Sequence, residues 1–108
     1  AVRLKPGFRD GYHNLAAAHL ALGEVTSAIE TYQTLLLTDP DDANVRVHVG
    51  SLLVAEGQPA AATEMLLECV RRRPDHAAAW CALAGVQRDE GHLDLAVEYY
   101  QRALRVAP

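Results

Sequence analysis

The sequence lacks the features of several common protein classes. None of its apolar runs approaches the roughly 20 residues with which a helix crosses a membrane. It has no glycine-rich phosphate loop, no nucleophile elbow and no HExxH metal motif. Its two cysteines, Cys69 and Cys81, form neither a disulfide framework nor the paired short spacing of a zinc knuckle. We therefore expect no catalysis, no metal or other cofactor and no membrane partner for these residues.

The sequence also lacks an excess of positive charge. Fourteen Asp and Glu residues outnumber ten Lys and Arg residues, and the formal net charge is −4. Nucleic acids are bound by basic surfaces. The basic run of residues 71–73 has acidic neighbours at Glu64, Glu68 and Asp75. We expect no nucleic-acid partner.

The first residues, AVRLKPGFRD, contain neither an initiator methionine nor the apolar segment of a signal peptide. We expect the chain to be a cut from a longer polypeptide, whose targeting signals are not visible here. Both thiols are expected to be reduced, and the cytoplasm is the expected location. With 108 residues, half of them apolar, the chain has the size of one modest domain.

A period of 34 residues runs through the sequence. Positions that are 34 residues apart form what we call a column. The clearest columns hold a proline, a glycine and a small residue: Pro6, Pro40, Pro74 and Pro108; Gly23, Gly57 and Gly91; Ala28, Ala62 and Ala96. Cys69 shares a column with Leu35, and Cys81 shares one with Val47. Neither column requires sulfur, so a metal site built on these cysteines loses its basis.

Within each period the residues resemble the tetratricopeptide repeat family, whose pattern is W-x₂-L-G-x₂-Y, then A-x₃-F, then P. The third copy carries Trp80, Leu83, Ala84, Ala96, Tyr100 and Pro108. Departures are Arg46 in the tryptophan column, and His19, Leu53 and Gln87 in the first tyrosine column. The resemblance covers residues 1–108. It implies an all-α fold of three tandem helix–turn–helix repeats, stacked as a right-handed superhelix, or α-solenoid.

Helical spacing of apolar residues predicts six helices, near residues 9–22, 25–38, 43–56, 59–72, 77–90 and 93–106. The expected organisation is the last turn of a preceding repeat helix at residues 1–8, then repeats at 9–42, 43–76 and 77–108. Acidic residues at helix starts and the arginines of residues 71–73 at a helix end suit the helix dipole.

In the resembling family, the first helices of the repeats line a concave groove that holds an extended peptide or a partner helix. The 34-residue step assigns the following residues to this groove: Asp10, His13, Asn14, Ala17, Leu20, Asn44, Val47, His48, Ser51, Val54, Ala78, Cys81, Ala82, Gly85 and Arg88. This surface is mostly small or apolar. The alternative is that these are ordinary exposed side chains without a ligand.

Family members that clamp the acidic C-terminus of chaperones use Lys, Arg and Asn in the groove. The corresponding residues here are His13, Ala17, His48, Ala78 and Ala82, so the clamp is absent. The first repeat is also similar to the repeat array of O-linked N-acetylglucosamine transferases, where an asparagine in the column of Asn14 contacts the ligand backbone.

The histidines are too few in any one place for a metal site, since zinc needs three or four supported ligands. His13 and His48 are expected on the same inner surface. We expect His19 to pack between paired helices, and His76 and His92 to lie solvated in connecting turns.

Two functions remain open at this stage. The first is a protein-interaction module that binds a protein or peptide in its groove. The second is a substrate-recognition or oligomerisation arm of a larger enzyme such as a glycosyltransferase. We also expect self-association through open repeat ends, with Leu95, Tyr99 and Val106 on an uncovered face of the last helix.

Overall fold

Six helices follow one another within residues 8–107. The computed structural model describes residues 8–107, and its helices are α1 (Phe8–Ala21), α2 (Val25–Thr38), α3 (Ala43–Ala55), α4 (Pro59–Arg72), α5 (Ala77–Asp89) and α6 (Leu93–Val106). Every predicted helix boundary is confirmed to within one residue. The helix turn expected at residues 1–8 falls outside the described residues, except for Phe8, which begins α1.

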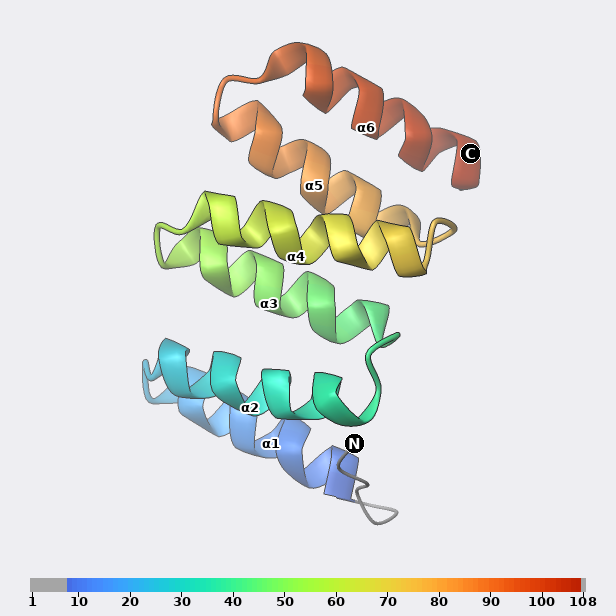
Figure 1. Cartoon of the computed structure of the whole chain (residues 1–108). Helices are drawn as coiled ribbons and strands as arrows, with labels where there is room; N and C mark the ends of the chain where they lie inside the picture. The colour runs from blue at the N-terminus through green and yellow to red at the C-terminus, as the bar shows by residue number, and fades with distance from the viewer. Residues whose placement is uncertain (1–7, 108) are drawn as a thin grey trace.

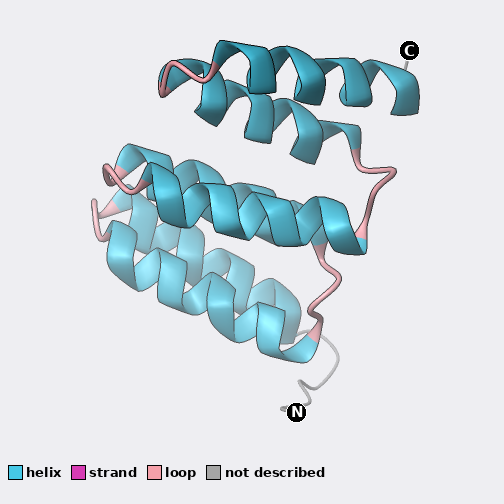
Figure 2. Ribbon diagram, turned by 45° about the horizontal axis from the view of Figure 1, so that its top comes forward, coloured by secondary structure: helices cyan, strands magenta, loops and turns pink. Residues whose placement is uncertain are grey.

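The helices stack in chain order, with α1 at one end and α6 at the other (Figure 1). They pack as three pairs, α1 with α2, α3 with α4 and α5 with α6, joined by short loops (Figure 2). No strand occurs within residues 8–107. The result is the all-α solenoid that the repeat predicts.

The turn inside each pair closes around a glycine with positive φ, at Gly23 (77°), Gly57 (74°) and Gly91 (84°). After α1, the amide of Glu24 donates to the carbonyl of His19 at 2.8 Å. The other two turns repeat this bond pattern. Side chains with a Cβ rarely adopt this conformation, so the glycine column is a backbone requirement.

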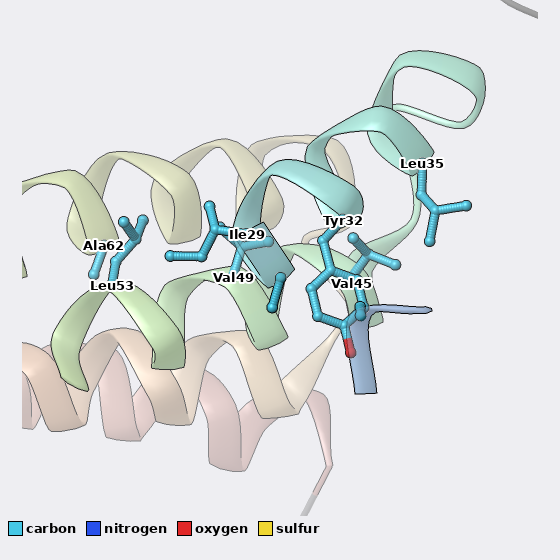
Figure 3. Packing of buried hydrophobic residues seen from close by; sticks show 9 residues of the cluster. Ile29, Tyr32, Leu35, Val45, Val49, Leu53 and Ala62 are labelled. Carbon is cyan, nitrogen blue, oxygen red and sulfur yellow. The ribbon is translucent and has the colours of Figure 1, made fainter. Parts of the chain in front are cut away.

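Small residues allow the paired helices to approach closely. Ala16, Ala28 and Ala62 are fully buried. At Gly50, an added Cβ would lie 3.0 Å from the side chain of Leu66. Figure 3 shows the core on either side of these contacts, where Ile29 of α2 meets the buried side chains of α3. The small columns therefore set the spacing of the stack.

The side chain in the tryptophan column donates the same hydrogen bond in both inter-repeat loops, to the carbonyl of the proline that precedes it. The indole Nε1 of Trp80 donates to the carbonyl of Pro74 at 2.9 Å. The guanidinium Nε of Arg46, in the equivalent position, donates to the carbonyl of Pro40, also at 2.9 Å. Burial, followed by the nearby charge of Arg72, lowers the pKa of Arg46 below its usual value. The second copy thus keeps the donor while replacing the aromatic ring.

The basic run joins the end of α4 to the preceding inter-repeat loop. Arg72 forms ion pairs with Glu68 of its own helix and with Asp41. Arg73 donates to the carbonyl of Asp41 at 3.2 Å. The carboxylate of Asp42 in the same loop caps α3 by accepting from the amide of Val45. These arginines have a structural role in addition to complementing the helix dipole.

The helices form two faces. We call the face formed by α1, α3 and α5 the inner face, and that formed by α2, α4 and α6 the outer face. Helices α3 and α5 contact each other directly, whereas α4 and α6 make no such contact in the described part of the chain. The last two repeats therefore curve toward the inner face.

Candidate functional site

Among residues 8–107, two pockets open on the inner face between successive first helices. The histidine pocket has a volume of about 370 Å³ and is lined by His13, Asn44, Val45, Val47, His48, His76 and Ala78. The glycine pocket has a volume of about 220 Å³ and is lined by Gly50, Ser51, Val54, Leu66, Ala82, Gly85, Val86 and Asp89. Most residues of both pockets come from α3 and α5.

In the histidine pocket, two histidine rings are held against a buried tyrosine. The ring centroids of His13 and His48 lie 5.9 Å and 5.4 Å from that of Tyr32. Tyr32 belongs to α2 and is 3% exposed, so it is a fixed support. His13 and His48 do lie on one surface, on neighbouring repeats. Both are accessible from the inner side, because His13 is half-buried and His48 is exposed.

The third ring of this pocket, His76, is oriented by its backbone contact. Its Nδ1 accepts from the amide of Ala79 at 3.2 Å, which caps α5. A neutral ring with Nδ1 as acceptor carries its proton on Nε2. That nitrogen lies 3.1 Å from Oδ1 of Asn44 and donates to it. The Asn44 amide is therefore positioned with its NH₂ group free to donate to a ligand carbonyl.

The glycine pocket is lined by several small residues and has an apolar base. Leu66 and Val86 are 1% and 7% exposed and close its base. Gly85 has open space around it, since an added Cβ would meet only the Tyr100 hydroxyl at 3.9 Å. The Ser51 hydroxyl and the Asp89 carboxylate supply the polar groups. Such a pocket fits a small apolar side chain and lets a peptide backbone approach.

The remaining predicted groove residues lie outside both pockets. Asp10, Asn14 and Ala17 are exposed on α1, and Cys81 is exposed on α5. Leu20 is partly buried against the core formed with α2 and α3.

Arg88 is exposed, but its guanidinium is already engaged. It contacts the carboxylate of Asp89 at 3.3 Å and the hydroxyl of Tyr100 at 3.1 Å. These bonds use two of the five N–H donors of the guanidinium, and the Asp89 carboxylate offsets its positive charge beside the glycine pocket. The inner face therefore offers little positive charge to an acidic ligand.

Sequence reasoning missed His76 and Asp89 as pocket residues. His76 was expected in a solvated turn, yet it is half-buried and caps a helix. The signal was its column, which it shares with the helix cap Asp42.

The two other histidines have partners of their own. His92 is exposed, and its Nδ1 contacts the side-chain oxygen of Gln87 at 2.9 Å. His19 is half-buried, as the packing expectation required, and its Nδ1 contacts Glu24 at 2.8 Å. Both contacts close a turn within a helix pair, so neither histidine belongs to the inner-face pockets.

A larger pocket lies on the outer face. This outer pocket has a volume of about 760 Å³ and is lined by Glu64, Leu67, Glu68, Val70, Arg71, Pro74, Trp80 and Arg102. Three of its four charged lining residues have partners: Glu68 pairs with Arg71, and Arg102 lies 5.3 Å from the centroid of the Trp80 ring. Volume alone does not identify a site. The inner face is favoured because its amide, hydroxyl and imidazole groups lie beside small residues.

No group of three histidine, cysteine or acidic side chains that could hold a metal ion occurs within residues 8–107. Over the same residues, none of the helices has the length and apolar character needed to cross a bilayer.

Comparison with known proteins identifies relatives in sequence. Two family models described as "Tetratricopeptide repeat" match residues 49–108 and 12–46. The "Probable UDP-N-acetylglucosamine--peptide N-acetylglucosaminyltransferase SPINDLY" of Hordeum vulgare is 36% identical over 83 residues, which are 75% of this chain and 9% of that protein. The "Hsp70-Hsp90 organizing protein" of Triticum aestivum is 36% identical over 58 residues, 54% of this chain and 10% of that protein. The chain thus spans about a tenth of these curated relatives.

Solved structures share the fold at low sequence identity. MamA matches with a TM-score of 0.80 and 22% identity, covering 90% of this chain and 57% of that one. The "First TPR of Spaghetti (RPAP3) bound to HSP90 peptide SRMEEVD" matches with a TM-score of 0.83 and 16% identity, covering 100% of this chain and 86% of that one. At these identities the likeness shows the fold alone.

Proposed function

Because the chain belongs to the tetratricopeptide repeat family, we propose that it is a protein-interaction module that holds an extended peptide or a partner helix on its inner face. The observation that carries this proposal is the pairing of two pockets along the same two helices, α3 and α5. One ligand lying along these helices would reach both pockets.

The two pockets would divide the work of recognition. The Asn44 amide, held by His76, donates to a backbone carbonyl of the ligand. The glycine pocket, with its apolar floor, takes a small apolar side chain. A few oriented polar groups fix the position of a ligand, while apolar contacts supply most of the affinity.

Charge selects the class of peptide. One structural neighbour is bound to the acidic peptide SRMEEVD. Here Arg88 is engaged by Asp89 and Tyr100, and the Asp89 carboxylate stands at the rim of the glycine pocket. We therefore assign to the inner face a neutral or basic peptide with a small apolar residue, and not an acidic C-terminal tail.

The test begins with a library of random peptides displayed on phage and selected on the wild-type chain. Selected peptides should be depleted in Asp and Glu and should carry a small apolar residue. Asn44→Ala combined with His48→Ala should weaken the best peptide at least about tenfold, because both residues line the histidine pocket. Both residues are exposed on the inner face, so the melting temperature should change little.

The peptide SRMEEVD serves as the charge control. It should show no saturable binding to the wild type. Selection of acidic peptides, or tight binding of SRMEEVD, would overturn the assigned ligand class. Failure to select any peptide that the double variant weakens would overturn the inner-face site itself.

A second candidate is a recognition or oligomerisation arm of a larger enzyme. The similarity to the barley glycosyltransferase relative supports it. Under this candidate the inner face still binds peptide, and any catalysis belongs to residues outside positions 1–108. The full-length sequence distinguishes the two: an attached catalytic domain supports the enzyme arm, and repeats alone support a free-standing module.

A further inference from the structure

The two inner-face pockets lie at different points along the same two helices. Asn44 of α3 and Ala78 of α5 line the histidine pocket. Ser51 and Gly85, each seven residues further along its helix, line the glycine pocket. Because an α-helix rises about 1.5 Å per residue, these positions lie about 10 Å apart along the helices. A single ligand that fills both pockets must span this distance between two of its side chains.

The Asn44 amide distinguishes an extended ligand from a helical one. Its Oδ1 accepts from Nε2 of His76 at 3.1 Å, so its NH₂ group supplies the donors for a ligand. Within an α-helix each carbonyl already accepts from the amide four residues later, except in the last turn. An extended segment keeps its carbonyls available along its whole length. The oriented amide therefore matches an extended ligand better than a partner helix.

An extended backbone determines which two side chains reach the pockets. In a polyproline II segment, side chains three positions apart lie on the same side and about 9 Å from each other. This distance matches the spacing of the pockets. In a flat β-strand, side chains on the same side are separated by about 7 Å at two positions or about 13 Å at four, and neither distance fits as well.

The two pockets admit side chains of different size. The glycine pocket has a volume of about 220 Å³, and Gly85 forms part of its wall. The histidine pocket has a volume of about 370 Å³ and includes the buried Val45. Two of its other lining groups are the imidazole rings of His13 and His48, which Tyr32 supports. Flat rings beside aliphatic side chains suit a large apolar or aromatic group.

We infer that the ligand of the inner face is an extended segment of polyproline II type with two anchors three residues apart. A large apolar or aromatic anchor fills the histidine pocket, and a small apolar anchor fills the glycine pocket. The two residues between the anchors turn their side chains away from the pockets, so proline fits there. This ligand class rests on the proposed function, since it describes the occupant of the same site.

The test starts from the best selected peptide that Asn44→Ala with His48→Ala weakens, because that weakening identifies the inner-face site independently of the spacing. Replacing each peptide position by alanine and by tryptophan locates the anchors by calorimetry. Truncation of the large anchor to alanine should weaken binding at least about tenfold, and so should enlargement of the small anchor to tryptophan.

Two variants of the chain assign each anchor to its pocket. Ala78→Trp fills the histidine pocket, and Ser51→Trp fills the glycine pocket, both from exposed positions. In Ala78→Trp, truncation of the large anchor should cost less than about twofold in affinity. In Ser51→Trp, enlargement of the small anchor should cost equally little. Each variant should leave the effect of the other anchor unchanged.

Three further peptides test the spacing and the conformation. One carries a glycine inserted between the anchors, and its matched control carries the same glycine outside them. The first should bind at least about tenfold more weakly than the parent peptide, and the control should match the parent within about twofold. A third peptide, with proline between the anchors, should also match the parent, because proline preserves an extended backbone.

The outcomes separate the ligand class from the proposed function. Anchors seven residues apart, with binding lost on proline substitution, would show that the ligand is a helix. Any other spacing, a single anchor, or tolerance of the inserted glycine would also contradict the two-anchor ligand, while inner-face binding would stand. If the double variant weakens none of the selected peptides, both the inner-face site and this ligand class are wrong.

Discussion

The inner and outer faces differ in how their polar groups are used. On the outer face, Glu68 forms ion pairs with both Arg71 and Arg72. In the outer pocket, the guanidinium of Arg102 lies over the ring of Trp80. On the inner face, exposed polar groups such as His48 and Ser51 lie beside glycine and alanine. The outer face therefore stabilises the stack, and the inner face retains the means to bind.

Pocket volume and binding capacity are thus separate properties. The outer pocket is about 760 Å³, and the inner pockets are about 370 and 220 Å³. A ligand on the outer face would have to displace ion pairs that already satisfy the side chains there. A ligand on the inner face meets an oriented amide and open backbone.

The largest contrast should appear in thiol chemistry. Cys81 is exposed on the inner face, whereas Cys69 is fully buried and its thiol donates to the carbonyl of Ala43 at 3.6 Å. Burial raises the pKa of the Cys69 thiol, so it stays protonated and unreactive. In a maleimide time course, Cys81 should react fully in the native protein and Cys69 only in denaturant.

A bound peptide should also protect Cys81 from maleimide. Rapid native labelling of Cys69 would contradict the described packing. Labelling of Cys81 that is unaffected by saturating peptide would place the ligand away from α5.

The next largest contrast is expected from a large side chain placed on the inner face, which should weaken peptide binding without unfolding the chain. Ser51→Trp places a large ring in the glycine pocket from an exposed position, and it should weaken peptide binding by about 100-fold with little change in melting temperature. The matched outer change is Leu67→Trp, at a 41% exposed residue of the outer pocket. It should leave the dissociation constant unchanged by calorimetry. Weaker binding in Leu67→Trp alone would reverse the two faces.

Alanine substitution at two glycines, one in the second repeat and one in the third, should change the free energy of unfolding in opposite directions. Gly50→Ala places a Cβ 3.0 Å from the buried Leu66 and should destabilise the fold by about 1–3 kcal/mol. Gly85→Ala meets nothing closer than 3.9 Å and should stabilise its helix by about 0.5–1 kcal/mol. Urea denaturation measures both changes. Equal effects at the two positions would show that the helix spacing at Gly50 is wrong.

The smallest effect is expected for the outer arginine network. Arg72 is 38% exposed at its side chain, and its ion pairs with Asp41 and Glu68 are accessible to solvent. Arg72→Ala should lower the free energy of unfolding by less than about 1 kcal/mol and should not affect peptide binding. A loss of several kcal/mol would mean that this network controls the junction between repeats.

The helices were predictable because their boundaries depend on local chemistry. Glycine at a positive φ ends the first helix of each pair, and a proline and a capping side chain precede the next repeat, so columns such as those of Gly23 and Asp42 mark the ends in the sequence. The small columns were predictable for the same reason, since only a residue such as Ala62 fits a fully buried close contact.

The pockets were less predictable because they depend on side-chain orientation across repeats. His76 and Asn44 are far apart in the sequence, and their contact requires both the cap of α5 and the approach of α3. Tyr99 was misplaced because helical spacing gives its helix face only approximately, and Trp80 offers an aromatic ring within reach. The equivalence of Arg46 and Trp80 as hydrogen-bond donors likewise became visible only in three dimensions.

The most direct measurement of the central claim is the dissociation constant of one selected peptide against three proteins: the wild type, Asn44→Ala with His48→Ala, and Arg72→Ala. If the inner face holds the ligand, the double variant should bind at least about tenfold more weakly, and Arg72→Ala should match the wild type. Equal affinity of the double variant and the wild type, or a loss confined to Arg72→Ala, would contradict the inner-face site.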